Sequence, residues 1–241
     1  MRPRQIFGFS GIMPMPSDDL GNVHLVDHAL SLSGSSAPKV CYVPTAVGDA
    51  RIAIETQERE FARRRPEIEF SVLSLFTQPS VADPRKHLLD QDVVLVEGGS
   101  VVNLLAVWRA HGLDEAFREA WEAGVVLAGP SAGSLCWHLG GPTDSFRDGL
   151  DPCTDGLGYL PYSNGVHDDF VDQPRRAAYR EMIARGTLPA GYASEGGVGL
   201  HYIGTELAEA VTIRRDARAW WVESDGVGGY AERAIHPRYL G

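Results

Sequence analysis

The chain has 241 residues and a formal charge of −10, with 44% hydrophobic and 22% charged residues. These values are typical of a globular protein and exclude a disordered or fibrous one. Lysine and arginine form no long block, so neither nucleic acid nor an anionic membrane surface is favoured as a partner. The length fits a single α/β domain over residues 1–241, and we expect it to act on a small molecule.

The cysteines and the hydropathy of the sequence indicate in which cellular compartment we expect the protein. Cys41, Cys136 and Cys153 are an odd number of cysteines, and their spacing is not that of a disulfide framework or a zinc site. The apolar segment near the amino terminus is too short for a signal peptide, and no uncharged apolar run reaches the roughly 18 residues of a membrane span. The sequence therefore predicts a soluble, cytoplasmic protein without a metal or cofactor.

Short apolar runs alternate with helical periodicity in the first half of the chain. Strands are predicted at Ile6–Phe9, Lys39–Ala46, Glu69–Phe76, Asp92–Val96 and Val125–Ala128. Helices are predicted at Leu20–Leu32, Ala53–Arg65, Asn103–Ala110 and Leu113–Ala123. This alternation is typical of a parallel sheet with crossover helices, in which ligands bind at the carboxyl ends of the strands.

Periodicity is weaker in the second half. The segment Gly141–Gln173 is rich in proline, glycine, aspartate and aromatic residues and is predicted to be mostly loop. Long loops in compact domains are usually functional or mobile. A helix at Arg175–Arg185 and a strand at Gly191–Ser194 are predicted to follow. The tail is predicted to form short strands in a meander that closes the sheet edge, at Glu209–Arg214, Ala219–Glu223 and Gly228–Ile235.

The sequence around Ser131 has the pattern of a nucleophile elbow. The predicted strand Val125–Ala128 runs into Gly129-Pro130-Ser131-Ala132-Gly133 and then into helix-compatible sequence. A sharp strand-to-helix turn lifts the serine Oγ above the sheet, and the flanking glycines let neighbouring backbone pass closely. The N–H of Ala132 lies at the helix start, where it favours a developing oxyanion. The same string also fits a glycine-rich turn after a core strand, so the assignment depends on partners.

A catalytic serine needs a base and a group that orients the base. Of the eight histidines, His167 lies in the irregular stretch that a site above the sheet would use, and it is the predicted base. The other histidines are predicted to be structural. Glu195 follows the strand Gly191–Ser194 and would project at its carboxyl end, so it is the favoured orienting carboxylate. The other carboxylates considered for this role are Asp144, Asp168 and Asp169. The resulting order Ser…His…Glu excludes a simple α/β-hydrolase, which runs Ser…Asp/Glu…His.

These motifs, taken in order, resemble those of peptidase family S51, typified by the aspartyl dipeptidase peptidase E, with cyanophycinase as a more distant member. The resemblance covers most of the chain. The family's glycine loop, serine elbow, histidine segment and glutamate are similar to Glu97–Leu105, Gly129–Gly133, Asn164–His167 and Glu195. It implies a three-layer α/β/α sandwich with a mostly parallel sheet, like that of class I glutamine amidotransferases, with serine in place of their cysteine.

The resemblance also implies roles for single residues. Ser131 would be the nucleophile, His167 the general base and then acid, and Glu195 the orienting carboxylate. The oxyanion hole would use the N–H groups of Ala132 and of the Gly98-Gly99 loop, with Gly99 as the preferred donor.

In peptidase E an arginine after the histidine recognises the P1 aspartate of the substrate. Arg175 falls nearest that place, with Arg176 beside it, and a planar guanidinium suits bidentate recognition of a carboxylate. Asp144 aligns with an aspartate near the family's active site and is assigned a supporting role.

The chain departs from the family pattern in two places. The glycine loop reads Glu97-Gly98-Gly99-Ser100 instead of the usual Gly-Gly-Gly-Asn, and the segment from His167 to Arg175 is shorter than in peptidase E. We expect a serine dipeptidase that prefers an N-terminal aspartate, acts through an acyl-enzyme and takes small peptides as partners; the resemblance allows a homodimer. A cyanophycinase-like isopeptide hydrolase and a non-catalytic ligand-binding protein of the same fold are the alternatives.

Overall fold

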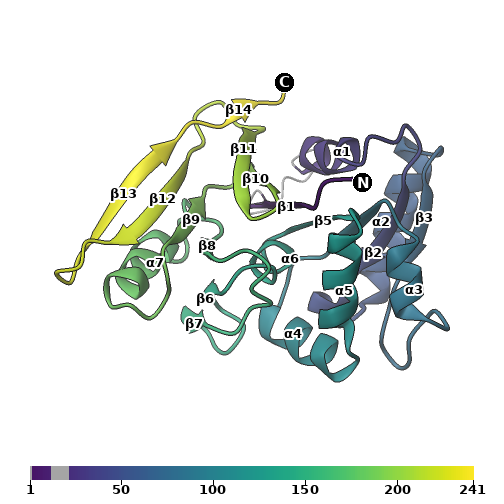
Figure 1. Cartoon of the computed structure of the whole chain (residues 1–241), viewed down its shortest axis with the longest axis horizontal. Coiled ribbons are helices and arrows are strands. Elements are labelled where there is room, and N and C mark those ends of the chain that lie inside the picture. The colour runs from purple at the N-terminus through teal and green to yellow at the C-terminus, as the bar shows by residue number, and fades with distance from the viewer. Residues whose placement is uncertain (1, 12–21) are drawn as a thin grey trace.

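The computed structural model describes residues 2–11 and 22–241. Eight strands form the main sheet: β1 (Gln5–Phe9), β2 (Lys39–Val43), β3 (Glu69–Val72), β4 (Val93–Val96), β5 (Val126–Pro130), β10 (Val198–Ile203), β11 (Glu206–Thr212) and β14 (Arg238–Tyr239). They lie in the order β14-β11-β10-β1-β5-β4-β2-β3 (Figure 1). Strand β4 is buried along its whole length, as expected for a strand covered on both faces.

The strands of the main sheet run in one direction except for β10. Strands β1, β5, β4, β2 and β3 pair in parallel, whereas β10 pairs antiparallel with both β1 and β11. The predicted mostly parallel sheet is confirmed. Because parallel strands end at one edge, the carboxyl ends of β1, β5, β4 and β2 lie together there.

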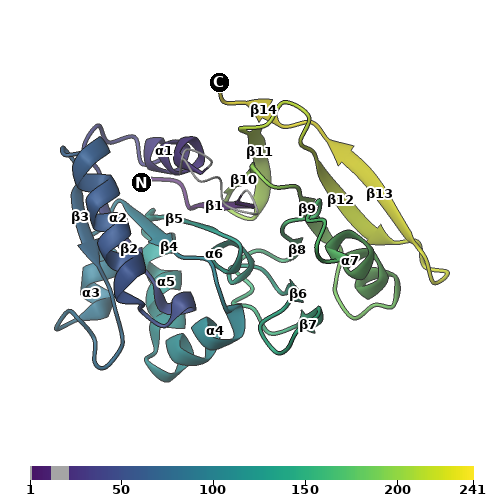
Figure 2. The same cartoon turned by 180° about the vertical axis from the view of Figure 1, so that it is seen from behind.

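Helices cover both faces of this sheet (Figures 1 and 2). One face carries α1 (Val23–Ser31) and α2 (Arg51–Arg64), which pack on the cluster that contains Phe9, Tyr42 and Leu95. The other carries α3 (Pro84–Leu89), α4 (Val101–Ala110) and α5 (Leu113–Glu122). The predicted three-layer α/β/α sandwich is therefore confirmed. Of the helix predicted at Leu20–Leu32, the first two residues lie outside the described residues.

The second half of the chain builds two further sheets. Strands β8 (Ser163–Gly165), β9 (Gly191–Ser194), β12 (Ala219–Ser224) and β13 (Tyr230–Ile235) form one in the order β13-β12-β9-β8, against which α7 (Arg175–Ala184) packs. Strands β6 (Gly141–Thr143) and β7 (Asp151–Cys153) form a hairpin within the predicted loop. The short helices η1 (Thr45–Val47) and α6 (Ala132–Leu135) follow β2 and β5.

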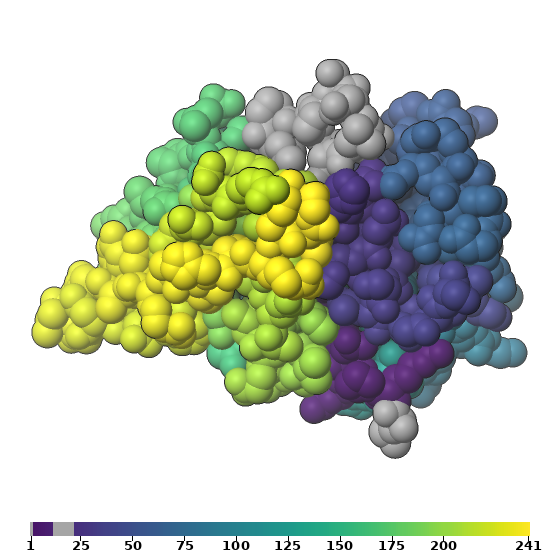
Figure 3. Space-filling view, turned by 90° about the horizontal axis from the view of Figure 1, so that it is seen from above, coloured from purple at the N-terminus to yellow at the C-terminus, as the bar shows by residue number. Residues whose placement is uncertain are grey.

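The predicted C-terminal meander is wrong in its pairing. Only β11 and β14 join the main sheet, whereas β12 pairs antiparallel with β9 and carries β13 with it. Edge-to-face contacts of Tyr192 with Tyr162 and Trp221 hold this second sheet together. The chain then returns to the main sheet, and Figure 3 shows its last residues, in yellow, against the purple amino-terminal part, where Leu240 packs on the cluster of α1.

Candidate active site

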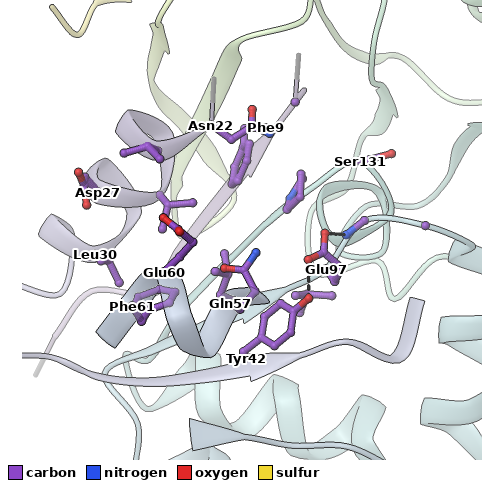
Figure 4. A pocket seen from close by; sticks show the side chains of 18 of the residues that line it. Phe9, Asn22, Asp27, Leu30, Tyr42, Gln57, Glu60, Phe61, Glu97 and Ser131 are labelled. Atoms are coloured by element: carbon purple, nitrogen blue, oxygen red, sulfur yellow. Dashed lines mark hydrogen bonds between the residues drawn. The ribbon is translucent and has the colours of Figure 1, made fainter. Parts of the chain in front are cut away.

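A cavity of ≈ 490 Å³ lies where the carboxyl ends of the parallel strands meet. It extends from Ser131 and His167 over the sheet face that α1 and α2 cover (Figure 4). Six of the residues singled out from the sequence line it, namely Gly98, Gly99, Ser131, Asp144, His167 and Arg175. Residues from five distant parts of the chain therefore converge on one space, although the cavity does not include Ala132 or Glu195.

Ser131 occupies the sharp turn between β5 and α6. Its backbone has φ +53° and ψ −112°, a strained conformation for a residue other than glycine. Its N–H donates to the carbonyl of Phe9 at 3.0 Å, which continues the pairing of β5 with β1. A Cβ on Gly129 or Gly133 would overlap the carbonyl oxygen of Val96 at the end of β4. The structure thus has the strand–turn–helix geometry of a nucleophile elbow.

The glycine loop after β4 lies beside this elbow. A Cβ built on Gly98 would stand 3.4 Å from Cβ of Ser131. The N–H of Gly98 donates to Oε1 of Glu97 at 2.9 Å, whereas the N–H of Gly99 has no partner among the described residues. Gly99 has φ +136°, and a Cβ there would overlap the carbonyl of Ala46. Gly99 and Ala132, the first residue of α6, are therefore the available amide donors around the serine.

His167 is 6% exposed and also has a left-handed backbone, with φ +57°. Its N–H donates to Oγ of Ser10 at 3.0 Å, and its Nδ1 lies 3.1 Å from the carbonyl oxygen of Gly11. Burial, and then the charge of Arg175, lower the pKa of His167 from 6.5 to about 4, against the opposing influence of the Gly11 carbonyl and two aspartates. The ring is therefore neutral at pH 7.

Glu195, predicted as the orienting carboxylate, makes its hydrogen bonds elsewhere. Its Oε1 accepts from Arg176 at 3.1 Å and its Oε2 accepts from the N–H of Arg218 at 2.8 Å. Within the described part of the chain, no hydrogen bond joins Glu195 to His167. The ring of His167 is held instead by the main chain at the end of β1.

Ser10 and Gly11 are site residues that the reasoning from sequence missed. Ser10 is fully buried; its hydroxyl accepts from the N–H of His167 and also bonds to Ser194 at the end of β9. Their place directly after the predicted strand Ile6–Phe9 was an available signal, because ligand sites collect at such ends.

The structure separates the two adjacent arginines at the start of α7. Arg175 is 7% exposed, lines the cavity and forms an ion pair with Asp144 at 2.9 Å, and its buried Nε has no hydrogen-bond partner among the described residues. Arg176 lies over the ring of Trp220 and pairs with Asp168 and Glu195 outside the cavity.

Asp144 is held by both Arg175 and Gln173, whose side-chain amide donates to it at 3.1 Å. Burial raises its pKa, but these two partners outweigh burial, so the pKa lies below the usual value and Asp144 is ionised.

Cys41, Cys136 and Cys153 are buried and form no disulfide. The described residues contain no group of three or more His, Cys, Asp or Glu side chains placed to hold a metal ion. No helix within residues 2–11 and 22–241 has the length and hydropathy needed to cross a membrane.

Comparison with known proteins gives consistent results. The family model of peptidase family S51 matches residues 16–210. The uncharacterised peptidase YgaJ of Bacillus subtilis (strain 168) is 38% identical over 222 residues, which cover 91% of this chain and 93% of that protein. The crystal structure of a peptidase from an acI-B1 actinobacterium covers 98% of this chain and 95% of its own, with a TM-score of 0.71 at 16% identity. A putative peptidase E protein from Listeria monocytogenes EGD-e matches over 88% of this chain and 100% of its own, with a TM-score of 0.62 at 17% identity. The chain therefore belongs to peptidase family S51.

Proposed function

We propose that this peptidase cleaves small peptides with Ser131 as the nucleophile and His167 as the general base. The observation that carries the proposal is the shared cavity, in which the strained elbow of Ser131 and the buried, neutral ring of His167 meet the glycine loop. A serine held in this conformation presents its Oγ above the sheet. A neutral imidazole beside it can accept the proton that the attack releases.

The hydrogen bonds of His167 support its role as a base. A carbonyl oxygen only accepts hydrogen bonds, so in the neutral ring Nδ1 carries the proton toward Gly11. Nε2 is then unprotonated and free to take the proton of Ser131 as its Oγ attacks the scissile carbonyl. Protonated His167 next donates this proton to the leaving amine. Water, activated by the same ring, then hydrolyses the acyl-enzyme.

The oxyanion formed in each attack would lie against the N–H groups of Gly99 and Ala132. The amide of Ala132 follows Ser131 directly at the start of α6, and the amide of Gly99 follows Gly98, the residue of the loop after β4 that lies beside the serine. The dipole of a helix start favours negative charge at this position. Loss of one such donor typically costs about 10²–10³-fold in kcat.

For the substrate we propose dipeptides with an N-terminal aspartate. Arg175 supports this preference because it is buried, lines the cavity of Ser131 and has a buried Nε without a partner in residues 2–11 and 22–241. A side-chain carboxylate of the substrate would complete the hydrogen bonding of this guanidinium, because an unpartnered buried donor is costly. Asp144 accepts from Nη2 of the same guanidinium.

The test is the Ser131→Ala variant, assayed on Asp-Leu and on cyanophycin. We expect turnover of the dipeptide to fall by several orders of magnitude, about 10⁶-fold for a comparable nucleophile. A fluorophosphonate probe should label the parent protein at Ser131 and leave the variant unlabelled. The matched control is Ser36→Ala, which removes an exposed hydroxyl far from the cavity and should change neither result.

Other outcomes select the alternatives. Cleavage of cyanophycin in preference to dipeptides would make the protein an isopeptide hydrolase that uses the same serine. A parent protein that neither cleaves peptides nor reacts with the probe would instead be a ligand-binding member of the fold. Full activity of Ser131→Ala would exclude the mechanism.

A further inference from the structure

The cavity contains one carboxylate that differs from the rest. Four acidic residues of the described part of the chain line it: Asp27, Glu60, Glu97 and Asp144. Asp27 pairs with Arg65 at 2.9 Å, Glu60 with Arg63 at 2.6 Å, and Asp144 with Arg175 at 2.9 Å. Among the described residues, Glu97 forms no ion pair. Charged groups in a partly closed site are usually paired with an opposite charge. The carboxylate of Glu97 therefore offers a place in the cavity where a cationic group of a ligand could bind.

Glu97 is held firmly in this position. Its Oε1 accepts from the N–H of Gly98 at 2.9 Å and its Oε2 accepts from the hydroxyl of Tyr42 at 2.5 Å. Burial, and then the charge of Glu97, raise the pKa of Tyr42, so its hydroxyl stays protonated and continues to donate. Each carboxylate oxygen has a further lone pair for another donor.

The position of Glu97 relative to the serine restricts which cation it can meet. Gly98, whose N–H contacts the carboxylate, is also the residue whose added Cβ would stand 3.4 Å from Cβ of Ser131. In Figure 4 the carboxylate lies between Ser131 and Gln57, at the junction of the catalytic end and the part of the cavity under α2. In a dipeptide the α-amino group is separated from the scissile carbonyl carbon only by Cα. The cation of a dipeptide attacked by Ser131 would therefore lie two bonds from the scissile carbon, and Glu97 is the carboxylate of the loop beside this serine.

We propose that Glu97 is a specificity-determining residue that binds the α-ammonium group of the substrate and so restricts the protein to peptides with a free amino terminus. The inference rests on the proposed peptidase function and adds the second recognition point to it. Arg175 takes the acidic side chain and Glu97 takes the amino group, so the N-terminal residue is held through two substituents of its Cα. Glu97 stands where the family pattern has the first glycine of its loop, so this carboxylate is a feature of the present sequence.

The Glu97→Gln variant tests the charge while it keeps the geometry. The glutamine oxygen can still accept from Gly98, and its NH₂ can donate to the hydroxyl of Tyr42. We expect the ratio of kcat/KM for Asp-Leu to that for N-acetyl-Asp-Leu to fall about tenfold to a hundredfold, the usual range for a hydrogen bond to a charged group. Glu119→Gln, on the opposite face of the sheet, removes the same charge from the protein and should leave the ratio unchanged.

A purely structural role for Glu97 makes a different prediction. If it only supports the glycine loop, the variant slows both substrates by one factor and the ratio stays constant, which overturns the proposal.

A binding measurement separates this inference from the proposed function. Calorimetry of the parent protein should show tighter binding of L-aspartate than of N-acetyl-L-aspartate, and Glu97→Gln should lose this difference. Neither ligand is cleaved, so the result does not depend on Ser131 being the nucleophile. Equal preferences in parent and variant, or no preference for the free amine in the parent, exclude the role of Glu97.

Discussion

The carbonyl oxygen of Gly11 lies 3.1 Å from Nδ1 of His167, so the main chain at the end of β1 orients the base of the proposed mechanism. A carbonyl fixes the same tautomer that a carboxylate would fix, but it carries no full negative charge to stabilise the imidazolium. Asp144 and Asp169 supply negative charge from a greater distance and raise the pKa of His167 against the effect of burial.

This arrangement predicts a modest effect for Glu195→Gln. The amide loses the charge that pairs with Arg176, yet the contact of His167 with Gly11 is unchanged. We expect kcat/KM for Asp-Leu to fall by less than about tenfold, whereas amidation of the orienting carboxylate in a Ser-His-Asp triad costs about 10⁴-fold in kcat. Steady-state kinetics with circular dichroism as a folding control provide the measurement. A loss near 10⁴-fold in a folded variant would instead support Glu195 as the orienting carboxylate of the triad predicted from the sequence.

The two arginines at the start of α7 should have separable effects. Arg175→Gln removes the buried guanidinium from the cavity, so the preference for Asp-Leu over Ala-Leu should fall at least about tenfold. Arg176→Gln is the matched control, because its guanidinium lies over Trp220 outside the cavity and should not affect the preference. The readout is the ratio of kcat/KM for the two dipeptides. An unchanged ratio in Arg175→Gln would show that another group recognises the aspartate side chain of the substrate.

The pH dependence should reflect the depressed pKa of His167. The base acts when neutral, so kcat/KM holds above the pKa of the free enzyme and falls as the pH drops through it. We expect the acidic limb near pH 4 instead of pH 6.5. Since the charge of Arg175 contributes to the depression, Arg175→Gln should move the limb to higher pH. Rate profiles with Ala-Leu measure both effects, and an acidic limb at pH 6.5 in the parent protein would contradict the depressed pKa of His167.

Gly99→Ala should damage catalysis more than folding. Its φ of +136° and the close carbonyl of Ala46 force the loop to shift, which moves the N–H assigned to the oxyanion hole. We expect a loss of about 10²–10³-fold in kcat, the usual cost of one such donor. Gly34→Ala is matched in having a positive φ, but nothing lies within 4 Å of its added Cβ, so its kcat should be retained. Equal kcat values in the two variants would argue against the assigned donor.

The sequence predicted those parts of the fold that local patterns specify. The buried runs of β4 and β5 and the glycines around Ser131 identify a parallel sheet with an elbow, because apolar composition and glycine act within a few residues. Helix α3 was missed although Asp83 and Pro84 form a recognisable start, in which the Asp83 side chain accepts from the N–H of Lys86.

Local sequence patterns do not specify which distant strands pair or which main-chain groups contact the site residues. Alternation predicts a strand at Ala219–Glu223 but does not say which sheet it joins, and β12 in fact pairs with β9. Strand β10 was not predicted. Its antiparallel pairing with β1 brings Val198 next to Ser10, a contact between residues far apart in the sequence. The partner of His167 is a carbonyl that every residue possesses, so the identity of Gly11 carries no signal for it.

The carbonyl oxygen of Val96 has a consequence for how this protein can change. It closes the space beside both Gly129 and Gly133, so the end of β4, which leads into the glycine loop, packs directly against the turn that carries Ser131. Neither glycine position can accept a side chain without moving Ser131 relative to the glycine loop. We therefore expect new substrate preferences to arise on the surrounding walls, at α1 and α2, where side chains can be exchanged without moving this turn.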